Sequence, residues 1–294
     1  MKICVKCGCE IARTRWHCDA CGWMPQSREG FVLLAPELLT RDDFYPETAH
    51  DQLIAVEDQS FWFLNRNDLI CEMITKYFPN AGSMMEIGCG NGFVLAGLAE
   101  KRPEMELFGA EAFLSGLKHA KKRLPDREFA QMDARKIPFV EEFDLVGAFD
   151  VIEHIPEDEL VLKEIYKSLK PDGGAIITVP QHPWLWSNTD ERAGHKRRYT
   201  KKELVNKLEQ AGFKIVFSSS FITLLFPFML ASRFLGFTKK SENKPQYGLR
   251  PPFLVTAMFQ KICKGERRLI NKLSLPFGGS LLCLGIKPGE KRST

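Results

Sequence analysis

The stretch that decides the fold is Met84-Met85-Glu86-Ile87-Gly88-Cys89-Gly90-Asn91-Gly92. It reads as a short apolar strand that runs into a Gly-x-Gly-x-Gly turn, and an apolar helix begins near Phe93. Glycines at such a turn let the backbone bend sharply and approach a ligand closely. Many nucleotide-binding strand–helix–strand units carry such a turn, so this segment alone predicts only a ligand of that general kind.

Three further strands are predicted after the turn, and an acidic residue follows each of them. These pairs are 105–110 with Glu111, 127–132 with Asp133, and 143–149 with Asp150. Glu111 lies 23 residues after Gly88, where such a unit presents a carboxylate to ribose hydroxyls. Helical patterns at 93–101, 113–124 and 156–169 alternate with the strands. The alternation predicts a parallel, doubly wound sheet with its ligand at the carboxyl edge of the strands.

This series resembles the class I S-adenosylmethionine (SAM)-dependent methyltransferases. The motifs that carry the resemblance are Glu86-Ile-Gly-Cys-Gly-Asn-Gly92, Glu111, Gln131-Met-Asp133-Ala, Phe143-Asp-Leu-Val-Gly-Ala-Phe-Asp-Val-Ile-Glu-His154 and Leu169-Lys-Pro-Asp-Gly-Gly174. The likeness runs from about Phe61 to Phe221. It implies an α/β fold, a Rossmann-like seven-stranded doubly wound sheet, in a methyltransferase domain that spans 61–294.

The resemblance also implies how SAM is held. The Gly-rich turn would hold the methionine part, Glu111 the ribose, and Asp133 the adenine amino group. The expected cofactor-binding residues are Glu86, Gly88, Cys89, Gly90, Asn91, Gly92, Glu111, Ala112, Asp133, Ala134 and Asp150. An NAD-binding unit is the alternative, but no oxidoreductase motif follows.

The N-terminal segment carries Cys4-x-x-Cys7 and Cys18-x-x-Cys21. Two such hairpins can place four thiolates tetrahedrally around zinc, so residues 1–26 are predicted to form a zinc-ribbon-like knuckle with a structural Zn²⁺. Residues 27–60 are expected to be a linker and N-terminal cap. Over about 35 residues the segment also resembles the zinc-ribbon rRNA guanine-N1 methyltransferases. The knuckle is therefore either a nucleic-acid docking module or a small cap packed on the catalytic domain.

Chemistry is expected around Asp150-x-x-Glu153-His154 and the later His195. This set resembles the acidic-x-x-Glu-His pattern of metal-dependent O-methyltransferases, which implies Mg²⁺ or Mn²⁺ bound by these four residues. The alternative is that Asp150 contacts SAM while His154 is a buried core residue. An oxygen acceptor must lose a proton, and His is the usual base near pH 7.

The candidate bases are His195 and His182, with His154 as a substitute for either. The other histidines are expected at the surface; these are His17, His50 and His119. Loops at the carboxyl edge carry substrate contacts, and the aromatic and basic residues after the strand at 174–180 are the candidates. They are Trp184, Trp186, Arg198 and Tyr199. Thr200-x-x-Glu203 predicts a capping box at the start of the next helix.

The last two strands are predicted at 213–219 and 280–287, so residues 220–279 form an insertion before the final strand. The insertion begins with an apolar run at 221–231 and continues with a basic amphipathic helical pattern. From 221 to 294 there are 13 Lys or Arg and 3 Asp or Glu. This pattern predicts either a helical lid or, through 220–275, a peripheral contact with a membrane surface.

Composition sets the remaining bounds. Hydrophobic residues make up 44% of 294 residues, which favours a packed core, and the polar, cysteine-rich start has no signal-peptide pattern. We therefore expect a cytoplasmic protein, peripheral at most at the membrane inner face. The predicted function is transfer of a methyl group from SAM to a small-molecule or lipid-linked acceptor, at oxygen. The alternatives are an rRNA base methyltransferase that docks through the knuckle and a non-catalytic SAM-binding scaffold.

Overall fold

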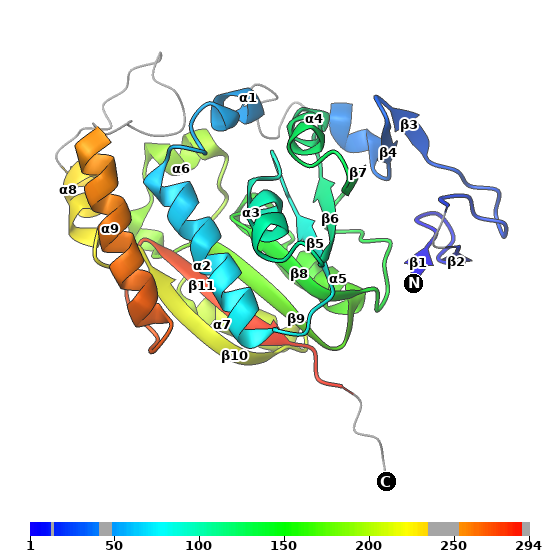
Figure 1. Cartoon of the computed structure of the whole chain (residues 1–294). Coiled ribbons are helices and arrows are strands. Elements are labelled where there is room, and N and C mark those ends of the chain that lie inside the picture. Colours follow the sequence, from blue (N-terminus) through cyan, green and yellow to red (C-terminus); the bar gives the residue numbers. More distant parts are fainter. Residues whose placement is uncertain (13–14, 41–48, 235–252, 290–294) are drawn as a thin grey trace, which may run out of the picture.

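The computed structural model describes residues 1–12, 15–40, 49–234 and 253–289. A nine-stranded sheet forms the centre, in the order β10-β11-β9-β8-β5-β6-β7-β4-β3, and helices cover both of its faces (Figure 1). Its strands are β3 (Gln26–Arg28), β4 (Phe31–Leu33), β5 (Ser83–Ile87), β6 (Glu106–Glu111), β7 (Glu128–Gln131), β8 (Phe143–Phe149), β9 (Leu169–Pro180), β10 (Lys214–Phe221) and β11 (Ser280–Ile286). β1 (Lys2–Ile3) and β2 (Glu10–Ile11) form a separate hairpin.

The helices are distributed along the whole chain. The α-helices are α1 (Ala49–Ile54), α2 (Phe61–Tyr77), α3 (Phe93–Lys101), α4 (Leu114–Arg123), α5 (Asp158–Ser168), α6 (Asn188–Ala193), α7 (Lys201–Gln210), α8 (Phe226–Phe234) and α9 (Phe253–Ile270). Short 3₁₀ helices are η1 (Pro36–Thr40), η2 (Ile152–His154) and η3 (Pro183–Leu185). Among these described helices, none combines the length and the apolar character needed to cross a bilayer.

Two hydrophobic layers hold the helices to the sheet. Successive side chains of a strand point to opposite faces, so Met84 and Met85, both fully buried, enter different layers. The Met84 layer is completed by α2, α3, α4 and α9, and the Met85 layer by α5 and α7. The doubly wound α/β fold is therefore confirmed.

The seven predicted strands are all present. β5 pairs in parallel with β6 and β8, whereas β11 runs antiparallel between β9 and β10. Strand β9 begins at Leu169, earlier than the predicted Gly174, so the Leu169–Gly174 motif lies within the strand. The helical insertion before the last strand is also confirmed by α8 and α9, although its residues 235–252 lie outside the described residues.

The sheet is wider than predicted at its other edge. Part of the segment expected to be a linker forms β3 and β4, and β4 pairs in parallel with β7 through Val32 and Leu33. The short run Phe31–Leu33 shows little period-2 alternation in the sequence, so its strand character depends on pairing with β7. The stretch with Pro46 lies outside the described residues.

Candidate active site

The glycine turn lies at the carboxyl end of β5 and opens α3. Gly88, Gly90 and Gly92 all have positive φ, at 64°, 50° and 72°, which side chains rarely adopt. A Cβ on Gly88 would lie 2.5 Å from Val151, whereas one on Gly90 would meet nothing nearer than the His50 ring at 4.0 Å. Gly88 therefore serves packing, and Gly90 leaves its backbone open toward the cavity above it.

That cavity has a volume of about 1460 Å³. Sites for drug-sized ligands usually measure roughly 300–1,000 Å³, so this one has room for a cofactor and a second ligand. Of the predicted cofactor residues it is lined by Glu86, Gly88, Cys89, Gly90, Asn91, Glu111, Ala112, Asp133, Ala134 and Asp150. Gly92 is not among the lining residues, because it packs against Ala120 of α4.

Glu111 ends β6 and faces the glycine turn. Its Oε2 accepts a hydrogen bond from the Gly90 amide at 2.9 Å, and its Oε1 accepts from the Ala112 amide at 2.8 Å. These bonds hold the carboxylate in one orientation at the cavity wall. Oε1 also accepts from the Phe113 amide at 3.2 Å, whereas Oε2 keeps a second lone pair that can accept from a ligand hydroxyl.

Asp133, beyond the end of β7, is held by Arg135. The Arg135 guanidinium donates to both carboxylate oxygens, with Nη2 at 2.8 Å from Oδ2 and Nε at 3.0 Å from Oδ1. This pairing raises the pKa of Arg135 above its usual value. Arg135 therefore presents the Asp133 carboxylate at the cavity in a fixed geometry.

Glu86 is the buried acid at the floor of the cavity. Its side chain is 3% exposed, and its Oε2 has no hydrogen-bond partner among the described residues. Burial raises the pKa of this carboxyl well above its usual range, although Arg66 opposes the shift. A buried acceptor without a partner is costly, which indicates that a ligand donor belongs there.

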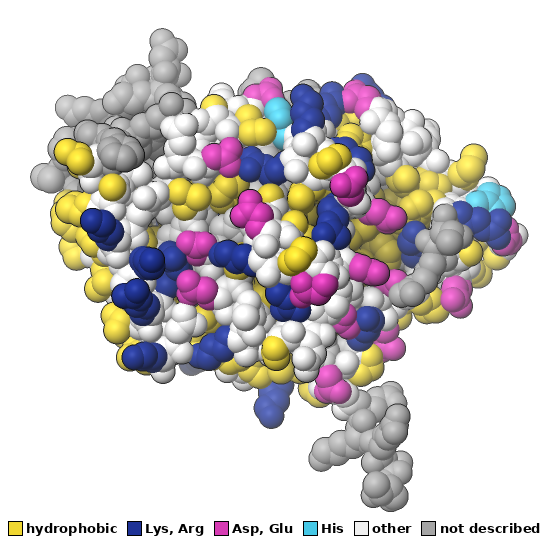
Figure 2. All heavy atoms as spheres, in the orientation of Figure 1, with side chains coloured by type: hydrophobic (Ala, Val, Ile, Leu, Met, Phe, Trp, Pro, Cys, Tyr) yellow, Lys and Arg dark blue, Asp and Glu magenta, His cyan; other side chains and the backbone are white. Residues whose placement is uncertain are grey.

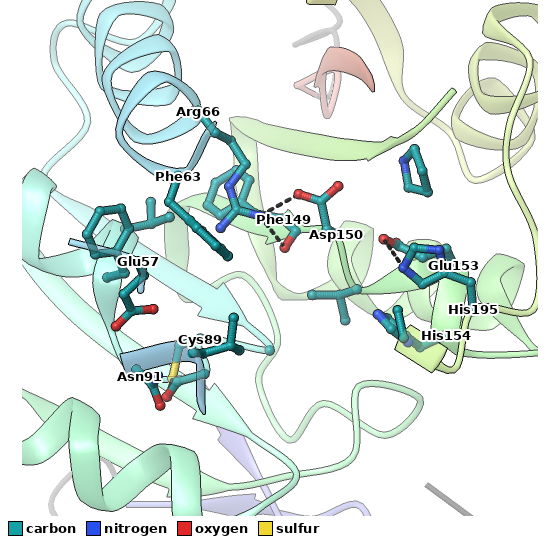
Figure 3. Close-up of a pocket in the computed structure, with 18 of the residues that line it drawn as sticks. Glu57, Phe63, Arg66, Cys89, Asn91, Phe149, Asp150, Glu153, His154 and His195 are labelled. Carbon is teal, nitrogen blue, oxygen red and sulfur yellow. Dashed lines mark hydrogen bonds and ion pairs between the residues drawn. The ribbon is translucent and has the colours of Figure 1, made fainter. Parts of the chain in front are cut away.

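Asp150 points away from Glu153 and toward α2 (Figure 3). Its Oδ2 accepts hydrogen bonds from Arg66 of α2 and from Thr178 Oγ1, the latter at 3.1 Å. The expected four-residue metal set is therefore not assembled, because Asp150 is paired with a cation. Arg66 was missed in the sequence, since nothing in a helical pattern shows which strand end a buried arginine will reach.

The remaining three residues of that set do come together. Glu153, His154 and His195 offer ligand atoms that all lie within 4.8 Å of one another, and the two imidazole rings are 4.8 Å apart (Figure 3). Glu153 is fully buried, and neither of its oxygens has a hydrogen-bond partner among the described residues. Burial, together with the nearby Asp150, raises the pKa of Glu153 well above its usual range. Burial and the neighbouring His195 lower the pKa of His154 to about 3, so His154 is neutral.

Asp190 of α6, which was not predicted from the sequence, orients His195. Its Oδ1 lies 2.9 Å from His195 Nδ1 and 2.7 Å from Arg198 Nε. Burial alone would raise the pKa of Asp190, but these two partners outweigh it and lower the pKa to about 2. The ionised carboxylate holds the proton of His195 on Nδ1 and leaves Nε2 as an acceptor, 4.0 Å from Glu153 Oε1.

Other candidates lie outside the cavity lining. His182 packs in an aromatic cluster with Phe277, at 4.3 Å between ring centroids, and with the half-exposed Trp184. Trp186 is 40% exposed. Tyr199 is fully buried and donates to Asp158 at 2.7 Å, so it anchors α5.

Arg198 and Thr200 lie close together after the loop that carries Trp184 and Trp186. Arg198 does line the cavity, and Thr200 caps α7 as predicted, with its Oγ1 accepting from the Glu203 amide at 3.1 Å.

His50, expected at the surface, is instead 4% exposed and lines the cavity beside the glycine turn. Its backbone carbonyl accepts from Asn91 at 3.0 Å, a contact over 41 residues that no local pattern indicates.

The N-terminal cysteines form a second candidate site. Cys4, Cys7, Cys18 and Cys21 place their sulfur atoms within 4.8 Å of one another, with Sγ–Sγ distances of 3.7 Å for Cys4–Cys21 and 3.6 Å for Cys7–Cys18. Gly8 and Gly22, which follow the second cysteine of each pair, have φ of 75° and 67°. Two turns that bring four thiols together can hold a tetrahedral metal ion.

Fold and site together define a class I SAM-dependent methyltransferase. Residues 62–217 match a family model described as a methyltransferase domain, which is more than half of the chain. The protein therefore belongs to this methyltransferase family and is an enzyme of that class.

Curated relatives resemble parts of the chain. A trans-aconitate 2-methyltransferase of Azoarcus sp. is 29% identical over 103 residues, which cover 35% of this chain and 41% of the relative. An S-adenosylmethionine-dependent methyltransferase of Mycolicibacterium smegmatis is 22% identical over 176 residues, which cover 58% of this chain and 66% of the relative. The chain thus spans between two fifths and two thirds of the length of these two relatives.

Solved structures share the fold. A complex of the Haloferax volcanii Trm112 methyltransferase activator with a methyltransferase matches with a TM-score of 0.56 at 17% identity, covering 83% of this chain and 99% of that chain. Phosphoethanolamine N-methyltransferase 2 of Haemonchus contortus, bound to SAM, matches with a TM-score of 0.52 at 18% identity, covering 76% of this chain and 52% of that chain.

Proposed function

We propose that this enzyme transfers a methyl group from SAM to an oxygen of a small-molecule or lipid-linked acceptor, with His195 as the general base. The observation that carries the proposal is the Asp190–His195 pair, in which the buried Asp190 orients His195 and His195 lines the same cavity as the glycine turn and Glu111. A base beside a cofactor site is what methyl transfer to a hydroxyl or carboxyl group requires.

The residues of the cavity fit SAM. Glu86, with its partnerless buried oxygen, suits the ammonium group of the methionine part, and Glu111 suits the ribose hydroxyls. Asp133 suits the adenine amino group, since its carboxylate is already held in place by Arg135. SAM supplies an electrophilic methyl group on a sulfonium, so the protein has mainly to align the acceptor and remove its proton.

His195 is placed to remove that proton. Because Asp190 holds the Nδ1 proton, Nε2 carries the lone pair that accepts a proton from the acceptor. The imidazolium that results is stabilised by the ionised Asp190 on one side. Burial raises the pKa of Glu153, which faces Nε2 at 4.0 Å, and so disfavours a second negative charge beside the base.

This base mechanism needs no Mg²⁺ or Mn²⁺. A divalent ion would gain most from two carboxylates, but Asp150 is engaged by Arg66 and Glu153 has a strongly raised pKa. Two imidazoles and one buried carboxyl remain, and His195 already uses one nitrogen for Asp190. We therefore expect turnover in buffer free of added divalent cations.

The insertion supports an apolar or lipid-linked acceptor. Met229 of α8 and Thr256, Ala257 and Gln260 of α9 line the far part of the cavity. The same helices also expose Phe228 (57%), Leu254 (79%) and Met258 (46%), none of which lines the cavity. Further along α9 the exposed side chains are Lys261, Lys264 and Arg268 together with Leu269, and the exposed Lys272 follows the helix.

An apolar tip with a basic flank suits an anionic membrane surface. Figure 2 shows hydrophobic side chains along the edge formed by α8 and α9, with Lys and Arg side chains beside them. A peripheral contact through this edge would bring the acceptor part of the cavity close to lipid. We include this membrane contact through α8 and α9 in the proposed function.

The knuckle supports a structural zinc rather than RNA docking. Its four cysteines suit Zn²⁺, and it lies at the opposite end of the molecule from α8 and α9, which line the acceptor part of the cavity (Figure 1). An RNA held at the knuckle would therefore be bound far from the part of the cavity where we place the acceptor. The rRNA methyltransferase alternative lacks a supporting observation.

Labelled methyl transfer tests the proposed function. The protein is incubated with SAM carrying a labelled methyl group and with separated lipid, small-molecule and RNA fractions of a cell extract. We expect label in the lipid or small-molecule fraction, released by mild alkali if the product is an ester. Label in RNA alone would replace the proposal with the RNA alternative. No label, with SAM bound, would contradict the catalytic assignment.

A further inference from the structure

The N-terminal clamp, defined here as residues 1–38, touches the chain on both sides of Asp133. On one side β4 pairs with β7, which ends at Gln131, two residues before Asp133. On the other side the knuckle contacts residues 138–140, where the Ile3 amide donates to Pro138 O at 3.0 Å and the Val140 amide donates to Met1 O at 2.9 Å. The loop that carries Asp133 is therefore fixed at both ends by the clamp.

Gln131 carries the first of these connections into the cofactor site. Its side chain is fully buried; its Oε1 accepts from the Ala35 amide at 3.0 Å, and its Nε2 donates to Ala35 O at 2.8 Å. The same Nε2 donates to Ala112 O at 3.0 Å, directly after Glu111. One amide thus links the clamp to the segments that present both Glu111 and Asp133.

Leu38 brings the clamp into the cavity itself. Leu38 lies in η1, three residues after Ala35. Its side chain is 6% exposed and lines the cavity together with Asp133 and Ala134. The contact at 138–140 also has an apolar part, since Trp16 packs edge-on against Phe139 with 5.8 Å between the ring centroids, and Phe139 is 2% exposed. The clamp therefore forms part of the cavity wall near Asp133.

The clamp has little core of its own. Its separate buried cluster comprises Cys4, Ile11 and Cys18, two of which are the proposed metal ligands. A segment this small depends on bound metal for its folded state, because metal binding supplies the folding free energy. Phe31, Leu33 and Leu34 of the clamp are buried in the main core, so loss of metal would release the 138–140 end of the Asp133 loop and weaken the hold of the clamp at the β7 end.

We propose that zinc in the N-terminal knuckle positions Gln131, Asp133 and Glu111 through the clamp, so that zinc binding and cofactor binding are thermodynamically coupled. Gln131 is a positioning residue in this scheme. The inference rests on the proposed SAM site. Coupling between two sites usually amounts to roughly 5- to 150-fold in affinity, and it is reciprocal.

The test measures S-adenosylhomocysteine affinity of the full chain by calorimetry, with zinc bound and in the double variant Cys18→Ser/Cys21→Ser. We expect affinity to fall by roughly 5- to 150-fold in the zinc-free variant. Equal affinity in the two folded proteins would overturn the inference and leave the proposed function intact. Absence of binding to the zinc-loaded protein would overturn the proposed function and this inference with it.

Two variants keep the test decisive if the cysteine variant fails to fold. Trp16→Ala keeps all four cysteines, so zinc stoichiometry should stay unchanged while affinity falls; unchanged affinity contradicts the coupling. Met24→Ala is the matched control, because Met24 is 69% exposed on the same segment. A second measurement checks the same coupling from the other side: the ligand should raise the zinc affinity, measured by chelator competition, by the same factor, and an unchanged zinc affinity would contradict the coupling.

Discussion

At the scale of the residue, the proposed chemistry depends on which nitrogen of His195 carries a proton. Asp190 is 1% exposed and also accepts from Arg198, so its charge and position are both well defined. Its lowered pKa, about 2, keeps it ionised at every pH where the enzyme would work. His195 is thus held with Nε2 toward Glu153, in the tautomer that a general base needs.

Replacing His195 with Ala should lower turnover by roughly 10²-fold or more and leave SAM affinity intact, because a general base acts only on the chemical step. Steady-state rates and calorimetry check the two halves of this prediction. His182→Ala is the comparison, since His182 lies outside the cavity lining and should retain activity. An active His195→Ala enzyme would remove the base from the mechanism.

Replacing Glu86 with Gln should stabilise the unliganded protein at neutral pH and weaken SAM binding. The folded-state pKa of Glu86 is raised well above the unfolded value, so the folded state binds an extra proton, and stability is lost as pH rises between the two values. Gln cannot ionise, so the Glu86→Gln variant does not lose this stability as pH rises. Urea unfolding at pH 4 and pH 8 measures it: the gain should appear at pH 8 and shrink at pH 4. A gain of equal size at both pH values would contradict the assignment.

At the scale of the element, α8 and α9 present side chains both to the cavity and to solvent. One face lines the cavity with Met229, Thr256 and Gln260, and the core side of α9 buries Cys263 and Ile270 against the sheet. Glu266 fixes the pair, since its carboxylate accepts from the Leu224 amide just before α8 at 2.7 Å. The outward face is left with Leu254 and Met258 exposed.

The double variant Leu254→Glu/Met258→Glu should bind vesicles containing phosphatidylserine at least roughly tenfold more weakly. Burying one apolar side chain contributes about 1.5–3 kcal/mol, and the added charges oppose the anionic surface. Vesicle sedimentation measures the binding. Leu160→Glu on α5 is the control, because Leu160 is equally apolar and 44% exposed on the other face of the sheet. Failure of the unmodified protein to bind would contradict the membrane contact.

At the scale of the whole molecule, one continuous sheet runs from β3 and β4 of the clamp to β10 and β11, the two strands that flank the insertion. β4 and β3 cover the edge of β7, which would otherwise present unpaired backbone groups. The sheet therefore joins the four-cysteine segment at one end to the helices α8 and α9 at the other (Figure 1). Described segments between Leu38 and Ser280 contribute to the wall of the cavity.

Protein purified without added metal should contain about one zinc per chain, bound by four cysteines. Elemental analysis gives the stoichiometry, and X-ray absorption gives the sulfur coordination, with Zn–S distances of about 2.3 Å. Removing zinc should lower the unfolding temperature, because the clamp contributes β3 and β4 to the main sheet. A folded, metal-free N-terminal segment would contradict the zinc site.

The sequence by itself determined seven of the strands, the glycine turn, the acidic strand ends and the four-cysteine pattern, but not β3 and β4. These features are local: turn chemistry requires glycine at positive φ, and each strand shows its own apolar pattern. The capping of α7 by Thr200 was predictable for the same reason, since donor and acceptor are three residues apart. Local spacing is sufficient wherever the interacting groups are close along the chain.

Only the tertiary structure decided which distant side chains meet. The pairing of Arg66 with Asp150 spans 84 residues, and that of Ala35 with Gln131 spans 96. His50 lines the cavity and His182 packs in an aromatic cluster, although both are single histidines in loosely patterned segments. Such outcomes depend on how helices and loops pack over the sheet edge, because packing fixes side-chain direction. No spacing within a sequence encodes that direction.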